Sequence, residues 1–159
     1  MKISPLQLQG HVFEEVSIEV ELDDENNPIP ASSFNFAGVL VQCDVGHADV
    51  VTETGELSAD TMLVSLNLRI MNADGVKAPY RIKVRVTGVF RWLMKDTSAV
   101  LRKDLTVVNG ATILYGAIRE MVMSVTSRAV SGQLLLPAVN FEDNRPSLEN
   151  TPSEAAKAE

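Results

Sequence analysis

The residues best suited to chemistry in this sequence are few and scattered. The sequence has one cysteine, Cys43, and two histidines, His11 and His47. A thiolate nucleophile needs a partnered base, and a zinc site needs three or four ligands at close spacing. His47 and Asp49 share a strand face but would need further ligands from elsewhere. We interpret Cys43 as a small buried apolar residue and both histidines as structural or solvated.

The carboxylates do not suggest acid–base catalysis. They cluster at Asp23-Asp24-Glu25 and Glu142-Asp143, in segments whose composition is typical of loops. General acid–base work needs carboxylates whose environments push their pKa values apart inside a pocket. The sequence also has no glycine-rich phosphate loop and no nucleophile elbow. We therefore expect a protein that is not an enzyme and that uses no cofactor or metal.

Charge and hydropathy restrict the partners and the compartment. The net charge of -7 argues against nucleic acid, whose phosphates attract basic surfaces. No apolar run reaches the roughly 18 residues of a membrane span, and residues 1–10 lack a signal-peptide core. A single unpaired cysteine fits a reducing compartment. We expect a cytoplasmic protein that does not insert into membranes.

Alternating apolar and polar residues predict a sheet with one buried and one wet face. The four segments with this pattern are 12–22, 36–51, 62–71 and 80–92. In the first, Val12, Val16 and Ile18 share one face and Glu15 and Glu19 the other. Turn-forming residues separate the segments. Four strands in succession favour an antiparallel sheet.

The pattern then changes to helical spacing. Asp96, Thr97 or Ser98 can cap a short helix that runs to Val108, and Asn109-Gly110 is a plausible helix stop. A second, long helix is predicted from about Ala111 to Val130. The resulting fold class is α+β, a four-stranded antiparallel sheet followed by one short and one long helix. Residues 1–141 form one domain, and 142–159 form an acidic, proline-containing tail that we expect to be mostly disordered.

Surplus apolar residues indicate a role in binding other chains. A small sheet covers only one side of the long helix, so the helix stripe is predicted to pack against another subunit. Aromatic residues near loops either contact extended polypeptides or simply close the core. The predicted subunit-interface residues are Leu114, Ile118, Met121, Val122 and Val125. The predicted client-binding residues are Phe34, Phe36, Phe90 and Trp92.

The C-terminal third resembles the SecB family of protein-export chaperones. The resemblance lies in Ile113-Leu114-Tyr115, Ile118-Arg119-Glu120, Thr126-Ser127-Arg128 and the segment Leu134-Leu135-Leu136-Pro137-Ala138-Val139-Asn140-Phe141. It implies a homotetramer, built as a dimer of dimers, that holds non-native polypeptides in apolar grooves without ATP. Three departures stand out. Gly116 replaces the family's usual proline, 129–133 replace its Gly-Phe-Pro turn, and an acidic stretch follows Phe141 where the family has a closing helix.

A further departure concerns the surface that export SecBs offer to the SecA motor. Glu15 and Glu19 match two of the family's acidic positions, but Lys83 stands where another acid belongs. Arg81 and Arg85 flank Lys83 on the same strand face. If the first and fourth strands are neighbours, these cations pair with the two glutamates. We therefore expect weak or absent SecA binding.

Three functions remain open at this stage. The first is an ATP-independent holdase that keeps unfolded or nascent polypeptides soluble for export or hand-over. The second is a SecB-like chaperone dedicated to one client, such as an antitoxin. The third is a non-enzymatic assembly or structural subunit, since a fold does not fix a function. The breadth of client binding separates them.

Overall fold

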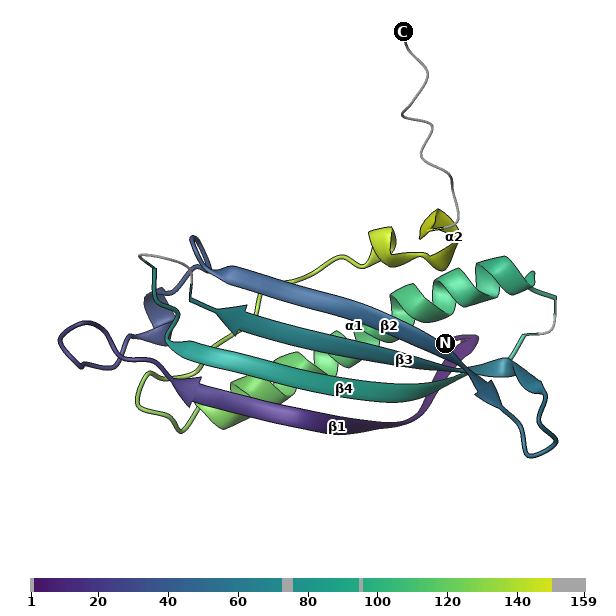
Figure 1. The fold of residues 1–159 in the computed structure, drawn as a ribbon, viewed down its shortest axis with the longest axis horizontal. Coiled ribbons are helices and arrows are strands. Elements are labelled where there is room, and N and C mark those ends of the chain that lie inside the picture. Colours follow the sequence, from purple (N-terminus) through teal and green to yellow (C-terminus); the bar gives the residue numbers. More distant parts are fainter. Residues whose placement is uncertain (1, 73–75, 95, 150–159) are drawn as a thin grey trace, which may run out of the picture.

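A four-stranded sheet and one long helix make up most of the molecule (Figure 1). The computed structural model describes residues 2–72, 76–94 and 96–149. The elements in chain order are β1 (Leu6–Val20), β2 (Leu40–Val51), β3 (Leu57–Met71), β4 (Tyr80–Trp92), α1 (Ala99–Thr126) and a short α2 (Pro146–Glu149). One-turn 3-10 helices occur at Ala31–Ser33 and Glu142–Asn144. The predicted α+β class is confirmed.

The sheet has the strand order β1-β4-β3-β2, and every neighbouring pair is antiparallel. The last three strands follow one another along the chain. β1 instead pairs with β4, so residues 21–39 must cross from one edge of the sheet to the other. We call this segment the crossover loop. The two edge strands of the sheet are therefore β1, which pairs with β4, and β2, which pairs with β3.

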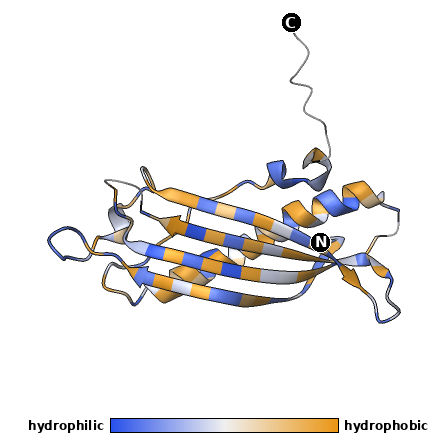
Figure 2. Ribbon diagram, in the orientation of Figure 1, coloured by the Kyte–Doolittle hydropathy of each residue, from blue (hydrophilic) through white to orange (hydrophobic). Residues whose placement is uncertain are grey.

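The core lies between α1 and the two central strands. Along β3 and β4 every second residue is buried, and hydrophobic and hydrophilic positions alternate along the ribbons in Figure 2. The buried strand residues include Val64, Leu66, Leu68, Ile70, Tyr80, Ile82, Val84 and Val86. They meet Ala111, Leu114, Ile118 and Val122 of the helix. The edge strands are covered less, because one helix is narrower than four strands.

A bulge in β1 divides its side chains between the two faces. Val12 pairs with Thr87 and Phe13 with Val86, but the register shifts at Glu14, so that Val16 pairs with Val84. Phe13 and Val16 therefore face the helix, whereas Val12 lies on the outer face and is 58% exposed. The predicted single face containing both Val12 and Val16 is wrong, because a bulge inserts one extra residue and reverses the alternation.

The helix is continuous through the position where a stop was predicted. α1 passes Asn109 and Gly110 without a break. A Cβ atom at Gly110 would lie 3.0 Å from a Val64 methyl group and 3.3 Å from the Phe90 ring. The glycine thus allows close approach of helix and sheet rather than ending the helix. At the other end, the Ser98 hydroxyl caps the helix by accepting the Leu101 N–H, as one of the three predicted caps.

The chain after α1 runs back along the helix on the β2 side (Figure 1). Residues 133–141 belong to no helix or strand. We call this segment the strap. The Tyr115 hydroxyl donates to the Pro137 carbonyl at 2.7 Å, and Arg119 Nε donates to the Leu136 carbonyl at 3.1 Å. Leu134, Leu136 and Phe141 are buried.

The folded part continues beyond Phe141. The backbone N–H of Ser147 donates to the Asp104 carboxylate of α1 at 2.9 Å, and its hydroxyl donates to the same group. The predicted disorder of residues 142–149 is therefore wrong, because short-range turns and this contact fix them against the helix. The predicted tail at 150–159 lies outside the described residues. None of the described helices is long and apolar enough to cross a membrane.

Substitution of Gly110 tests the close approach of helix and sheet. Gly110→Leu should destabilise the protein by about 1–3 kcal/mol, because the added side chain overpacks the helix–sheet contact. Gly116→Ala is the control. A Cβ at Gly116 meets nothing within 4 Å, so alanine should stabilise by roughly 0.5–1 kcal/mol. Urea unfolding at one protein concentration measures the free energy of unfolding of both variants. A tolerated leucine at position 110 would contradict the continuous, tightly packed helix.

Candidate functional site

The crossover loop brings two of the predicted client-binding residues together. The rings of Phe34 and Phe36 have centroids 4.7 Å apart and are tilted at 56°. Both side chains are half-buried and pack against the edge of the core. The pair thus keeps apolar surface in contact with solvent on a segment without regular structure.

The backbone of the crossover loop holds this aromatic pair in place. Phe36 adopts a φ of 61°, in the left-handed region where bulky residues are rare. Such a conformation costs about 1–3 kcal/mol and persists only where its surroundings impose it. The Ala31 N–H donates to the Ser131 carbonyl at 2.8 Å, which ties the loop to the turn after α1. Nearby, Gly38 packs against Val76.

The other two predicted client-binding residues belong to the core. Phe90 is 0% exposed and Trp92 is 5% exposed, and both lie on the helix-facing side of β4. Neither offers surface to a client in this fold. The alternative that these aromatics close the core therefore applies to Phe90 and Trp92.

The predicted subunit-interface stripe on α1 is divided between two environments. Leu114, Ile118 and Val122 are fully buried against the sheet of the same chain, so they are not available to another subunit. Val125 is exposed, and Met121 is half-buried. The helical spacing was correct, but it could not tell which side of the stripe the chain's own sheet would cover.

A shallow hollow between β1 and α1 was not predicted. It is lined by His11, Phe13, Ala117, Glu120, Met121 and Ser124. The His11 and Phe13 rings meet edge to face at 5.7 Å. The alternation read from the sequence missed this site, because the bulge after Phe13 decides which side chains face the helix.

The outer sheet face carries the ion pairs that the sequence predicted. Since β1 and β4 are neighbours, Lys83 contacts Glu15 at 2.6 Å, and Arg85 contacts it at 3.5 Å. Arg81 contacts Glu19 at 3.6 Å. The hydrogen bond from Lys83 lowers the pKa of Glu15. The acidic positions that resemble a SecA-facing surface are therefore paired with cations.

The reactive residue types do not cluster into a metal site in the described part of the chain. No group of three or more His, Cys, Asp or Glu side chains that could hold a metal ion occurs there. Cys43 faces the helix side of β2, and its burial, with a smaller effect of Asp44, raises the pKa of the thiol to about 11. At neutral pH the thiol is protonated and a poor nucleophile.

Comparison with known proteins identifies the fold of this chain. No family model matches the sequence, and no curated protein does so significantly. Among solved structures, the Rv1957 SecB-like chaperone of Mycobacterium tuberculosis, in complex with a ChAD peptide from the Rv1956 HigA1 antitoxin, superposes with a TM-score of 0.52. It shares 17% identity, with 86% of this chain and 91% of that chain covered. The fold is SecB-like.

A second solved structure has a similar fold and no known role. It is a protein of unknown function from Streptococcus agalactiae, with a TM-score of 0.51 and 12% identity. The alignment covers 84% of this chain and 97% of that chain. At these identities the likeness concerns the fold, and the functional assignment must come from this chain's own surface.

Thiol labelling tests the placement of Cys43. A pKa of about 11, against 9.0 for the free side chain, lowers the thiolate fraction about 100-fold at pH 8. The native protein should react with a disulfide reagent about 100-fold more slowly than the urea-unfolded chain. Because the thiolate fraction grows with pH below the pKa, the native rate should rise about tenfold between pH 8 and 9. Equal rates for native and unfolded protein would show that β2 opens readily.

Proposed function

We propose that this protein is an ATP-independent holdase chaperone that binds unfolded or nascent polypeptides and keeps them soluble. The observation that carries the proposal is the half-buried Phe34–Phe36 pair, held on a strained loop of a SecB-like fold. Aromatic rings offer a large contact area with few rotatable bonds, which suits binding to many sequences. Such binding needs no catalytic residues, so we propose no enzymatic activity.

Self-association is part of the proposal. Val16 and Val20 of β1 are on the helix-facing side of the sheet, yet they are 44% and 39% exposed. Together with Phe13, Met121 and Val125 they leave an apolar margin on the β1 side of the helix. Burial of this margin between copies would stabilise a homotetramer built as a dimer of dimers. We place this assembly in the cytoplasm.

A version dedicated to one client is the second candidate. The M. tuberculosis chaperone with a similar fold was solved with an antitoxin peptide. In this chain the ion pairs on β1 and β4 neutralise the face that resembles a SecA-docking surface. Both observations favour hand-over of a particular client over export. An assembly subunit would instead bind one folded partner.

Light scattering separates these functions. Two or three unrelated proteins are unfolded and diluted into buffer with and without this protein, in the absence of ATP. A general holdase suppresses the aggregation of all of them near one tetramer per client. Suppression of one client only supports the dedicated version. No effect on any of these unfolded chains contradicts the general holdase and leaves a dedicated chaperone or an assembly subunit, which isolation of the native partner would separate.

Substitution of the aromatic pair tests where clients bind. Phe36→Asn removes the ring and, because asparagine tolerates the left-handed region, keeps the loop conformation. Combined with Phe34→Ser, it should weaken client capture several-fold without changing the oligomeric state. Val130→Asn, which removes a 75% exposed apolar side chain from the turn after α1, is the control. Loss of the oligomer in the double variant would place the pair in an interface instead.

Binding to SecA tests the role of the outer sheet face. We expect no affinity as tight as micromolar at physiological salt, because Lys83 stands where the family has an acid. Arg81 and Arg85 flank it and pair with Glu19 and Glu15. Lys83→Glu should increase the affinity, since it removes a cation and adds a carboxylate beside Glu15. Isothermal titration calorimetry with SecA measures the affinity of the unchanged protein and of the Lys83→Glu variant. Micromolar binding by the unchanged protein would contradict this reading of the face.

A further inference from the structure

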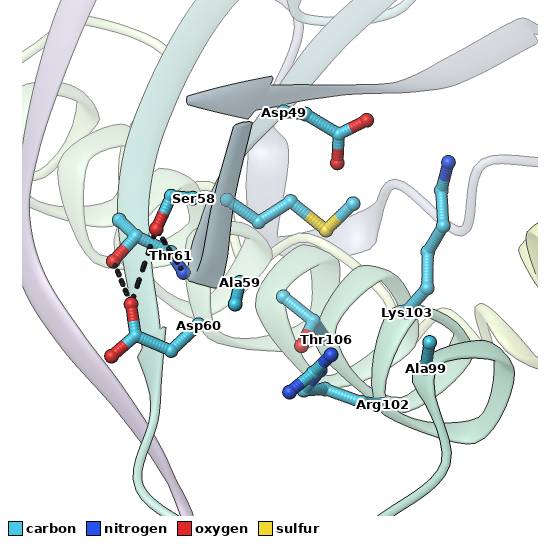
Figure 3. A pocket seen from close by; sticks show the side chains of 10 residues that line it. Asp49, Ser58, Ala59, Asp60, Thr61, Ala99, Arg102, Lys103 and Thr106 are labelled. Atoms are coloured by element: carbon cyan, nitrogen blue, oxygen red, sulfur yellow. Dashed lines mark hydrogen bonds between the residues drawn. The ribbon is translucent and has the colours of Figure 1, made fainter. Parts of the chain in front are cut away.

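An open hollow lies where the hairpin between β2 and β3 meets the first turns of α1 (Figure 3). Its volume is about 190 Å³, and its lining comes from all three elements. A second hollow adjoins it and shares Ala59, Asp60 and Arg102 with it. The second hollow adds apolar surface from Trp92, Leu93 and Met94. We refer to the two together as the hairpin groove.

The carboxylate of Asp60 is already satisfied on one wall of the hairpin groove. It accepts hydrogen bonds from the Ser58 and Thr61 hydroxyls at 3.1 and 2.9 Å and from Arg91 Nε at 3.1 Å. Figure 3 shows this carboxylate turned toward Ser58 and Thr61. These partners, Thr61 first, hold the pKa of Asp60 below its usual range. Asp60 therefore remains ionised and engaged with its own neighbours.

The cations on the opposite wall lack such partners. Neither Arg102 nor Lys103 forms an ion pair with any residue in the described part of the chain. Figure 3 shows both reaching from α1 beside the hollow, with Asp49 of β2 across from them. The groove lining thus has the cations Arg91, Arg102 and Lys103 and the carboxylates Asp49 and Asp60, an excess of one positive charge. The whole chain has a net charge of -7.

Two features at this end of the fold reduce the stability of the chain itself. The first turn of α1 has no acidic residue, and Arg102 and Lys103 add positive charge near the positive end of the helix dipole. The indole N–H of Trp92 is buried and has no hydrogen-bond partner among the described residues. Buried polar groups without a hydrogen-bond partner are uncommon in proteins. Features that lower the stability of a fold are expected at its functional sites.

We propose that the hairpin groove binds an extended client segment in which an acidic residue lies within a few positions of an apolar one. This inference rests on the proposed chaperone function. The apolar side chain would lie against Leu93 and Met94, which are 54% and 57% exposed, and the carboxylate against Arg102 and Lys103. Because Arg102 borders both hollows, the two client residues lie close together along the extended segment.

The charge pattern sets this groove apart from the Phe34–Phe36 pair. That pair supplies apolar contact without cations, and so accepts many sequences. The hairpin groove supplies a cationic site in an otherwise acidic protein, and so adds a preference for acidic client segments. A negatively charged client would be repelled by the overall charge, which means that any preference for acidic peptides must come from local cations. Removal of the groove cations then tests whether that preference arises in the groove.

Fluorescence anisotropy with three labelled peptides tests the proposal on the full chain. The peptides share one apolar sequence and carry Glu, Gln or Lys three positions after a leucine. The Glu peptide should bind about five- to tenfold more tightly than the Gln peptide, the sum expected of two partly exposed ion pairs. The ratio should shrink between 50 and 300 mM salt, where the screening length falls. Equal affinities for the Glu and Gln peptides would overturn the proposal.

The variant Arg102→Gln with Lys103→Gln locates the preference. It should abolish the discrimination between the Glu and Gln peptides while leaving the affinity for the Gln peptide within about twofold, which also shows that the variant is folded. Arg128→Gln, an exposed cation just past the end of α1, is the matched control and should keep the discrimination. Discrimination that survives the double variant would place the acid-binding site elsewhere and overturn the proposal.

Two further outcomes have separate meanings. Aggregation suppression without any preference for the Glu peptide refutes the acidic specificity and leaves the chaperone function intact. If a second copy of the chain covers the groove, the double variant changes the dissociation of the oligomer on dilution and leaves peptide discrimination unaltered. That result overturns the proposal and makes the groove an interface between copies.

Discussion

The contact between α1 and the centre of the sheet determines the rest of the structure. Gly110 and Ala111 bring the helix close to Val64 and Phe90, and the burial of β3 and β4 follows from that contact. Burial of this apolar surface is the main stabilising contribution available to a chain of this size. Because one helix cannot cover four strands, the apolar residues at both edges of the sheet need a further segment to cover them. The strap covers the β2 side, where Tyr115 packs against Phe141. On the β1 side, within the described chain, valines stay partly exposed.

The sequence predicted most reliably those elements whose environment is uniform along their length. In β3 and β4 one face is buried throughout, so alternation alone identified Leu66, Leu68, Val84 and Val86 as core. In β1 the extra residue at Glu14 reverses the alternation, and nothing in the residue types marks that position. Gly110 had two physical meanings, helix end and close packing, and only the tertiary contact decides between them. The ion pairs of Lys83 were predictable once the neighbouring strand was assumed.

The candidate sites were harder to predict, because they depend on which surfaces the chain covers by itself. Phe34 and Phe90 look alike in sequence, yet one lies in the crossover loop and the other beneath the helix. Leu114 and Val125 share a helical stripe, but only the first faces the sheet. The hairpin groove combines residues from β2, β3, β4 and α1. No sequence spacing brings those residues together, so only the fold reveals their shared surface. The proposed chaperone function therefore rests on three-dimensional exposure rather than on a motif.

The pairing of β1 with β4 has a consequence for synthesis of the chain. Val20 pairs with Tyr80 and Leu6 with Trp92, so the partners are separated by 80 - 20 = 60 and 92 - 6 = 86 residues. At about 5–20 residues per second, β4 leaves the ribosome several seconds after β1. Contacts between such distant residues also slow folding, because a long loop must close before they form. During that interval the first strand has unpaired backbone groups and exposed valines. A newly made copy of this protein thus passes through the same condition as the polypeptides that we propose it binds.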